Sequence, residues 1–427
     1  MVNAYQSVRI LRDHLPDILL PSMGEPIMES PDEALGALAE SLRRVANVRG
    51  ESRKKLRAID SPDLIRVTDH IWRCSVSQSY NWFLISESGK ALVIDYGYDS
   101  AGTAFPGYSS PPHRRALLHG LGPLRDRFGI DRIDVVLVSH FHDDHVCGIP
   151  VLQRLFGTEC WAAENFADLI EHPEAHCFPC NWPVPIQVDR RIALDETVQW
   201  EEYNFHFAAM SGHTRFASLI GFEADGMRFA HTGDQYFFNG DGPFSERTRI
   251  HNYVYRNGAL LEGFEESGRW LLDWRPDVVL QGHWDPFFTD EDFYAHIEAW
   301  IDDYREVHES IMPLGPEETH FNLDSWGGWI WPYRVHLKEP DTVKVTVTVR
   351  NPFPREAKLD LRLVGPKGWV GSAVTLDAPP RAEVQAEMEI TPNASCRRQP
   401  FAIDLTADGR PFGQVAEALL TVGGVRW

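Results

Sequence analysis

The stretch Ser139-His140-Phe141-His142-Asp143-Asp144-His145 contains three imidazoles and two carboxylates within six residues. It directly follows the apolar run IDVVLV at 133–138, and a short run rich in Val and Ile is typical of a buried strand. The pattern of 148–156 predicts a helix. In open α/β sheets, ligands gather where strands end, so we expect the cluster in a strand-to-helix turn at a functional site.

The chemistry of this cluster favours metal binding over packing. A lone histidine is most often an ordinary core or surface residue. Adjacent imidazoles, however, would be poorly solvated when buried and would repel one another when protonated. Neutral imidazole and carboxylate are common ligands of divalent transition metals. The stretch therefore predicts a metal site.

Further candidate ligands lie in turns after other apolar runs. Each such motif is weak by itself, but their succession after the first cluster is specific. The candidates are Asp95, His213, Asp234 and His283.

The order of these motifs resembles the metallo-β-lactamase superfamily, and the resemblance covers about residues 62–310. It implies an α/β fold of the αββα sandwich type with a binuclear metal site. One metal ion would be held by His140, His142 and His213, and the other by Asp144, His145 and His283, with Asp234 between them. Asp95 would orient a ligand or its loop, and Asp144 would both ligate and steer the nucleophile, which makes these two the expected catalytic residues.

The resemblance also implies a reaction. Two divalent ions about 3.5–4 Å apart share a hydroxide that attacks a small-molecule ester, thioester, lactone or amide. The ligand set suits Zn²⁺, but iron and manganese accept the same ligands, and no cysteine forces zinc. Two alternatives stay open: a β-lactamase, and an iron-dependent oxidoreductase that resembles a persulfide dioxygenase.

Other residues near the ligand turns have two interpretations each. Tyr236, His251 and Trp284 either line the substrate pocket or are ordinary loop aromatics. Arg215 either meets an anionic substrate group or forms a surface ion pair. The CFPC motif at 177–180 is either a small metal or redox site or part of a loop over the metals.

Composition limits the partners. The chain of 427 residues has a net charge of −21, which argues against binding to nucleic acid or to an anionic membrane surface. No apolar segment approaches the roughly 20 residues of a membrane span. Six cysteines in a chain this long do not indicate a disulfide framework. We expect a cytoplasmic protein with a small-molecule substrate.

The pattern of apolar and polar residues changes along the chain and predicts three domains: a helical extension at 1–60, a catalytic domain at 61–325, and a C-terminal β-sandwich at 335–427. The sandwich is a candidate surface for forming homo-oligomers. A Trp-rich join, 325–334, lies before the sandwich. Residues 15–26 align without gaps on 275–286, with Met23 in place of His283. The extension is therefore either the remnant of a duplicated segment or a chance similarity. Within the catalytic domain, the pattern predicts one strand at 200–208 and helices at 114–128, 257–273 and 290–309.

Overall fold

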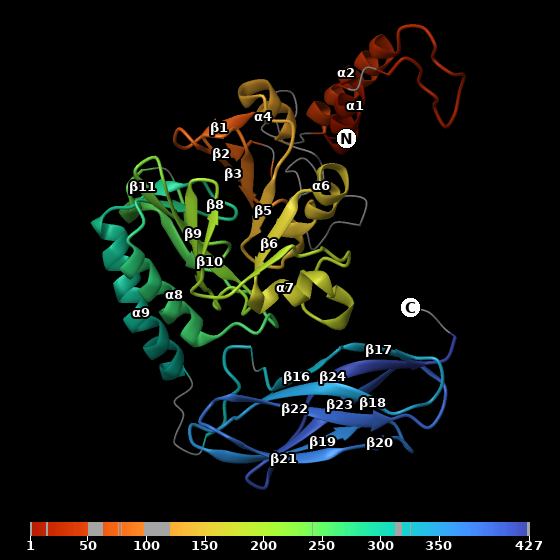
Figure 1. Cartoon of the computed structure of the whole chain (residues 1–427), viewed down its shortest axis with the longest axis vertical. Helices are drawn as coiled ribbons and strands as arrows, with labels where there is room; N and C mark the ends of the chain where they lie inside the picture. Colours follow the sequence, from red (N-terminus) through yellow and green to blue (C-terminus); the bar gives the residue numbers. More distant parts are fainter. Residues whose placement is uncertain are drawn as a thin grey trace.

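The computed structural model describes residues 2–13, 16–49, 63–75, 77, 79–97, 120–240, 242–311, 318–324 and 326–424. Figure 1 shows an α/β body made of two sheets with helices on their outer sides, an all-β sandwich below it, and two N-terminal helices that stand apart. The predicted fold class is therefore confirmed. The boundaries between domains remain proposals.

The first sheet of the body has seven strands, which lie side by side in chain order. β1 to β4 are antiparallel hairpins, whereas β4 to β7 run parallel. All residues of β3, β4 and β5 are buried, as expected for apolar runs covered on both faces. The strands are β1 (Leu64–Arg66), β2 (Ile71–Cys74), β3 (Trp82–Ile85), β4 (Ala91–Ile94), β5 (Val135–Val138), β6 (Glu159–Ala163) and β7 (Arg190–Ile192).

The second sheet has the order β15-β14-β11-β10-β9-β8, and only its β11–β14 pair is parallel. Beside it lies the hairpin β12–β13, which the sequence did not predict. The predicted strand at 200–208 is present from Tyr203 on as part of β9, but a turn at 201–202 separates it from Trp200, which ends β8. The strands are β8 (Thr197–Trp200), β9 (Tyr203–Ala209), β10 (Ser218–Ala224), β11 (Met227–His231), β12 (Tyr236–Asn239), β13 (Thr248–His251), β14 (Val278–Leu280) and β15 (Phe287–Phe288).

Helices cover the outer faces of both sheets: α4, α6 and α7 lie beside the first sheet and α8 and α9 beside the second (Figure 1). One apolar core fills the space between the sheets, and another joins the second sheet to α8 and α9. None of the described helices combines the length and the apolar character that a membrane crossing requires. The body's helices are α4 (Leu121–Phe128), α5 (Asp143–Val146), α6 (Ile149–Phe156), α7 (Glu164–Glu171), α8 (Leu261–Trp274), α9 (Glu291–Ile311) and the 3₁₀ turns η3 (Pro173–Ala175) and η4 (Phe244–Glu246). The predicted helix at 114–128 is seen from Leu121, and its first six residues lie outside the described part.

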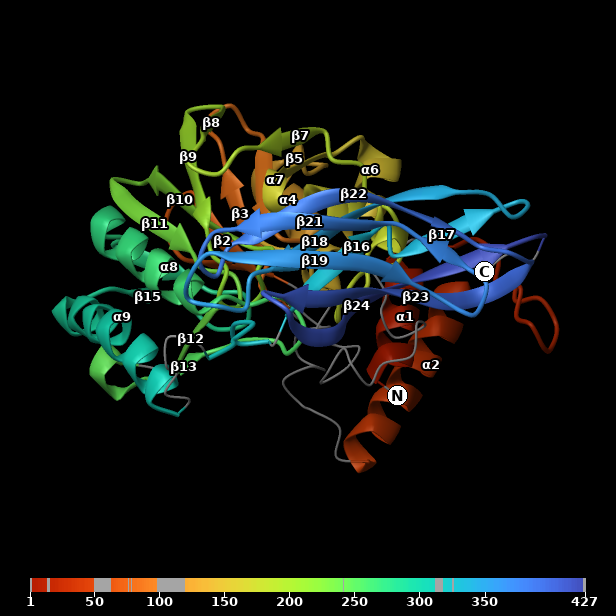
Figure 2. The ribbon, with the colours of Figure 1, turned by 90° about the horizontal axis from the view of Figure 1, so that it is seen from below.

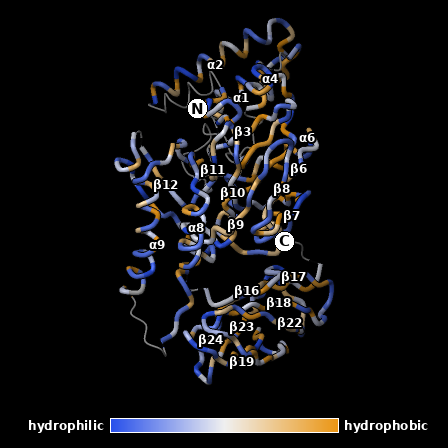
Figure 3. Tube along the Cα trace, turned by 60° about the vertical axis from the view of Figure 1, so that its left-hand side comes forward, coloured by the Kyte–Doolittle hydropathy of each residue, from blue (hydrophilic) through white to orange (hydrophobic). Residues whose placement is uncertain are grey.

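The C-terminal sandwich packs a four-stranded sheet, β16-β18-β22-β20, on a five-stranded one, β17-β24-β23-β19-β21. Burial alternates strictly along β19, and orange and blue segments are interspersed along the strands of the sandwich in Figure 3. The Trp-rich join contributes β16, so the sheets begin before residue 335. The strands are β16 (Gly328–Trp331), β17 (Arg334–Leu337), β18 (Val343–Arg350), β19 (Ala357–Val364), β20 (Val370–Gly371), β21 (Ala373–Ala378), β22 (Glu383–Thr391), β23 (Cys396–Ala407) and β24 (Arg410–Val422).

The N-terminal helices α1 (Val2–Asp13) and α2 (Pro31–Val48) pack mainly on each other and lie beside the body, as Figure 2 also shows. Among residues 16–30 between them, the structure shows one bridge, Leu19 to Ile27, and no strand. The aligned copy at 275–286 instead contains the buried strand β14. The two copies therefore differ in structure, and duplication receives no support from the fold.

A short segment before β16 ties the sandwich to the body. α8 has no side-chain cap of its own, but Asn322 Oδ1 accepts a hydrogen bond from Leu261 N at 2.9 Å and satisfies this orphan donor at the helix start. Asn322 Nδ2 also donates to Glu262 Oε2 at 2.8 Å. The first turn of α8 is thus held by a residue some 60 positions further along the chain.

Asn322→Ala removes this cap. We expect it to lower the free energy of unfolding by about 1–2 kcal/mol, the usual cost of losing a helix cap. Urea unfolding measures this loss, and Asn204→Ala, on an exposed position of β9, is the control. Equal stability of the two variants would contradict the assigned cap.

Candidate metal centre

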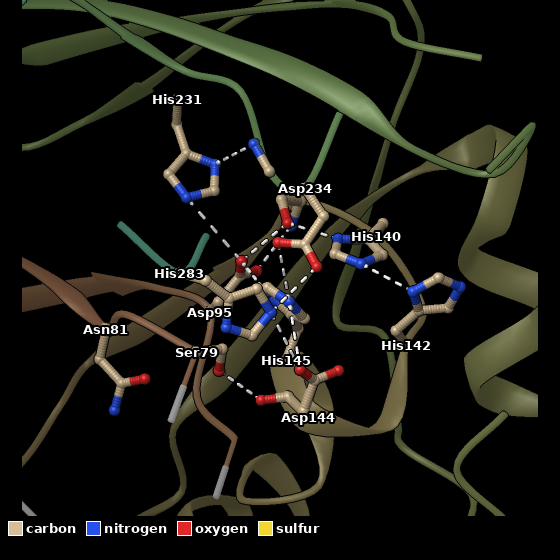
Figure 4. A network of polar contacts seen from close by, with 12 residues as sticks. Ser79, Asn81, Asp95, His140, His142, Asp144, His145, His231, Asp234 and His283 are labelled. Atoms are coloured by element: carbon tan, nitrogen blue, oxygen red, sulfur yellow. Dashed lines mark hydrogen bonds and ion pairs between the residues drawn. The ribbon is translucent and has the colours of Figure 1, made fainter. Parts of the chain in front are cut away.

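Two groups of potential ligands meet where strands of both sheets end. His140 and His142 follow β5, and His213 lies in the turn between β9 and β10; we call these the three-histidine group. Asp144, His145, Asp234 and His283 form the mixed group, in α5 and in the turns after β11 and β14 (Figure 4). Within each group, one ligand atom of every residue lies within 4.8 Å of the others. The structure thus brings together all seven predicted ligands.

The ring nitrogens of the three-histidine group share one centre. His142 Nδ1 lies 3.1 Å from His140 Nε2 and 3.1 Å from His213 Nε2. One ring nitrogen cannot donate a hydrogen to two neighbours, so hydrogen bonds alone do not account for this arrangement. Nitrogens 2.0–2.1 Å from a tetrahedral zinc ion lie about 3.3 Å apart, close to the spacing found here. The group therefore fits a metal ion.

The outward-facing nitrogens of two of these rings fix their tautomers. Ser139 Oγ lies 2.7 Å from Asp95 Oδ2 and 2.9 Å from His140 Nδ1. Because a carboxylate only accepts, the serine donates to Asp95 and accepts from His140 Nδ1. His142 Nε2 similarly faces Asn257 Oδ1 at 3.4 Å, a long contact in which the amide oxygen accepts. Both rings thereby direct a lone pair at the shared centre.

His213 has an amide neighbour. Asn252 Nδ2 lies 2.9 Å from His213 Nδ1 and 3.1 Å from the carbonyl oxygen of Asp234. In this orientation the amide donates to the ring, which places the ring hydrogen on Nε2. The reversed amide fills the same volume, accepts the Nδ1 hydrogen and frees Nε2 for a metal ion, while giving up the bond to Asp234.

The mixed group is held together by charge. His283 Nε2 lies 3.0 Å from Asp234 Oδ2 and 3.2 Å from Asp144 Oδ2. His145 Nε2 lies 3.3 Å from Asp234 Oδ1, yet neither atom makes a hydrogen bond within the described residues. Buried polar atoms without partners are rare, and such a pair of orphans facing each other suits a bound cation.

Asp95 braces the mixed group from behind. It sits in the left-handed region at φ 59° after β4 and is fully buried. Its carboxylate accepts hydrogen bonds from Ser139 N at 2.8 Å and from His145 Nδ1 at 2.8 Å. The second bond directs the Nδ1 hydrogen at Asp95 and leaves His145 Nε2 facing Asp234, where it offers a lone pair to a metal ion once the ring has lost its extra proton. Asp95 thus lies behind the mixed group and orients His145, which is the role that the sequence predicts for it.

The pKa values of the histidines shift in opposite directions in the two groups. Burial lowers the pKa of His142 to about 3 and that of His213 to about 4, so both rings are neutral. Burial also opposes the charging of His283, but Asp234 and Asp144 outweigh it and raise its pKa to about 10. The same carboxylates raise the pKa of His145 well above its usual range against burial. Positive charge is therefore favoured in the mixed group, as protons or as a cation.

Two of the expected pocket residues lie elsewhere. Tyr236 is fully buried, stacks on Phe238 and shares a hydrogen bond of 2.8 Å with Ser267. His251, its partner across the β12–β13 hairpin, packs against Phe264 and Trp300. Successive strand residues face opposite ways, so both side chains point into the core beside α8 and α9. The prediction that Tyr236 and His251 line the substrate pocket is therefore wrong.

Their chain neighbours face the centre instead. Phe237, between two buried residues of β12, lies 6.1 Å from His283 and 6.0 Å from Trp284, measured between ring centroids. Asn252 follows His251 and contacts His213. Trp284 therefore stays a candidate pocket residue, and Phe237 joins it.

The structure also decides between the two interpretations of Arg215 and of the CFPC motif at 177–180. Arg215 forms a bidentate ion pair with Glu383 of the sandwich, and not a contact with the ligand groups. Cys177 and Cys180 are exposed, and neither belongs to a potential metal-binding group of the described residues. The third such group, Asp95 with His140 and His145, lies at the same centre as the other two. Asn252 and Asn257, which contact ligand rings, carry no motif that could have identified them.

Close backbone approach makes Gly282 a sensitive position. A Cβ atom there would lie 1.9 Å from Asp234 Oδ1 and 3.0 Å from His145 Cε1. Gly282→Ala should displace the Asp234 carboxylate and weaken metal binding at least about tenfold, which competition with a chromophoric chelator measures. Gly122→Ala, in helix α4 with open space around it, should leave affinity unchanged. Unaltered affinity in Gly282→Ala would contradict this geometry.

Metal binding should release protons from the mixed group. At pH 7.5 His145 and His283 are protonated because their pKa values are raised, and each must lose its proton to bind a metal ion. The three-histidine group is neutral and releases none. Calorimetric titration of metal-free protein with zinc, repeated in buffers of different ionisation enthalpy, should yield about two protons per chain. Uptake of metal without proton release would refute the assigned charges.

Comparisons with known proteins agree with this fold. The hydroxyacylglutathione hydrolase of Stenotrophomonas maltophilia is 30% identical over 170 residues, 40% of this chain and 48% of the relative. That of Xanthomonas euvesicatoria is 28% identical over 171 residues, 40% and 51% respectively. The chain thus spans about half the length of these curated relatives.

Solved structures show a more distant likeness. A metallo-β-lactamase from Cronobacter sakazakii has a TM-score of 0.41 at 17% identity, covering 59% of this chain and 94% of that one. Another from Novosphingobium pentaromativorans has a TM-score of 0.41 at 15% identity, covering 59% and 92%. Both are too distant to bear on activity. The family model described as the metallo-beta-lactamase superfamily, however, matches residues 78–295, just over half of the chain. The protein therefore belongs to the metallo-β-lactamase superfamily.

Proposed function

We propose that this protein is a binuclear metal-dependent hydrolase of a small-molecule ester, thioester, lactone or amide. The observation that carries the proposal is the convergence of two ligand groups around Asp234. Asp234 Oδ2 lies 3.0 Å from His283 Nε2 in its own group and 3.9 Å from His213 Nε2 in the other. One carboxylate thus faces both positions, an arrangement suited to two adjacent divalent ions.

Each group would hold one metal ion. The three-histidine group supplies three neutral nitrogens, and the mixed group supplies two imidazoles and Asp144, with Asp234 between the two positions. When bound, the ions lower the pKa of a water molecule so that it attacks at neutral pH, and they polarise the substrate's carbonyl oxygen. Zn²⁺ is our first choice for this ligand set, and iron and manganese are the alternatives.

The protein's own side chains position the reaction. His140, His145 and His213 are almost fully buried, whereas the side chains of Asp144 and His283 are 11% and 20% exposed. Substrate therefore approaches from the side of Asp144 and His283. There the Asp144 carboxylate orients the attacking water and accepts its proton, while Phe237 and Trp284 offer an apolar wall beside His283.

Among the candidate bonds, a thioester is the first to test. The curated relatives that match this chain are named hydroxyacylglutathione hydrolases. The match covers about half of each, so the group attached to the sulfur stays open. No observation on the described residues favours the β-lactamase or the iron oxidoreductase over a hydrolase of this kind.

The proposal predicts metal-dependent turnover. Protein treated with a chelator should lose hydrolysis of a thioester, ester, lactone and amide panel, and added Zn²⁺ should restore it. His142→Ala removes a proposed ligand and should lower kcat/KM at least about a hundred-fold, since mutating even an outer partner of a ligand typically costs about 10–100-fold. His336→Ala, an exposed histidine on β17, is the matched control. Full activity after chelation, or in His142→Ala, would overturn the proposal.

A further inference from the structure

Three loops around the three-histidine group are tied to the C-terminal segment. They are the turn that carries His213, the loop 252–260, and the Pro-rich loop 172–183. Figure 1 shows the sandwich lying against the body near α7 and near one end of α8, whose first residue, Leu261, contacts Asn322. Each of these loops contacts residues beyond 320.

The loop 252–260 is held by Asp324. This side chain is almost fully buried, its Oδ2 accepts a hydrogen bond from Ala259 N at 3.1 Å, and it faces the amides of the preceding loop residues. Asn322 fixes the end of the same loop through Leu261 N. Asn257 lies in this loop, and its side chain is the partner of His142. A residue of the C-terminal segment thereby holds the loop that orients one ring of the three-histidine group.

The His213 turn is connected to the same loop and to the sandwich. Val254 N donates to His213 O at 3.0 Å, and Arg215 N donates to Asn257 O at 3.1 Å. The guanidinium of Arg215 pairs with Glu383 on β22 and lies 4.9 Å from the ring centroid of Trp329 on β16. Both charged side chains of this pair are largely buried, so the contact is more than a solvated surface pair.

The Pro-rich loop makes the third connection. Tyr333 N donates to Ala175 O at 2.7 Å, and Trp326 stacks on Phe178 with centroids 5.4 Å apart. Further along the same loop, Cys180 O accepts from Asp143 N, and residue 181 bridges to His142. The backbone around His142 is therefore also held from the sandwich side.

The mixed group has different support. Asp95 holds His145, and Ser79 Oγ donates to the backbone oxygen of Asp144. Gly282 N donates to Gly233 O at 2.8 Å and links the turns that carry Asp234 and His283. All of these residues belong to the body.

We propose that the C-terminal segment and its sandwich position the three-histidine group, through Asp324 with Asn257 and through Glu383 with Arg215, and so set the affinity of that metal position alone. The mixed position depends on the body. This inference rests on the proposed metal pair and is independent of the substrate. It makes Asn257 and Glu383 positioning residues, and the sandwich a part of the metal centre's support.

The test measures two zinc affinities per chain. Metal-free wild type and variants are titrated with Zn²⁺ against a chromophoric chelator, and Co²⁺ absorption spectra report the ligand geometry. His213→Ala and His283→Ala identify which step belongs to which group. Asn257→Ala and Glu383→Ala should weaken the three-histidine step about tenfold or more and leave the mixed step unchanged.

Two further variants separate positioning from general damage. Asn257→Asp keeps an acceptor for His142, and it loses no bond because Asn257 Nδ2 makes none within the described residues. It should retain wild-type affinity. Asp377→Ala removes another acidic strand residue of the sandwich, which pairs with Lys358 at 3.2 Å, and should change neither step. Thermal unfolding and light scattering confirm that all variants are folded with the same mass.

The outcomes are distinct. Loss confined to the three-histidine step supports the inference. Unchanged affinities in both Asn257→Ala and Glu383→Ala, or equal weakening of both steps, would overturn it. A wild-type protein that binds no metal would instead remove the proposed function on which the inference rests.

Discussion

The centre of this protein depends on where the imidazole rings direct their single hydrogens. His140, His142 and His145 each face an outward acceptor: the hydroxyl of Ser139, the amide oxygen of Asn257 and the carboxylate of Asp95. His140 and His142 therefore present a lone pair inward, and His145 presents Nε2, which offers a lone pair when its proton is displaced. Such a convergence is unfavourable in a buried space without a cation, and it becomes favourable with one. The strands, turns and close glycine contacts of the body serve to hold these rings in place.

Much of this arrangement could be predicted from the sequence. Asp95 and the seven ligand candidates each follow an apolar strand, and strands that end at the same edge bring such turns together. The apolar run at 133–138 predicts the central strand β5, and alternation predicts the sandwich. These signals are local, and local signals are what a single sequence shows best.

The misassignments have a physical cause as well. Tyr236 and His251 were chosen because they lie near ligands in the chain, but strand residues alternate between two faces. Their neighbours Phe237 and Asn252 occupy the face that meets the centre. The outward partner Asn257 could not be predicted, since it lies in a loop whose position depends on Asp324, 67 residues later. Such tertiary contacts leave no periodic trace in a sequence.

The proposed centre holds two cations, and a crystal of protein purified without added metal tests this most directly. Anomalous diffraction at the zinc, iron and manganese absorption edges would identify each ion. The account predicts two peaks about 3.5–4 Å apart, one within about 2.0–2.2 Å of His140, His142 and His213, the other at the same distance from Asp144, His145 and His283. Metal peaks that lie only elsewhere in the crystal, or no peak between these residues even after the crystal is soaked with Zn²⁺, would contradict it.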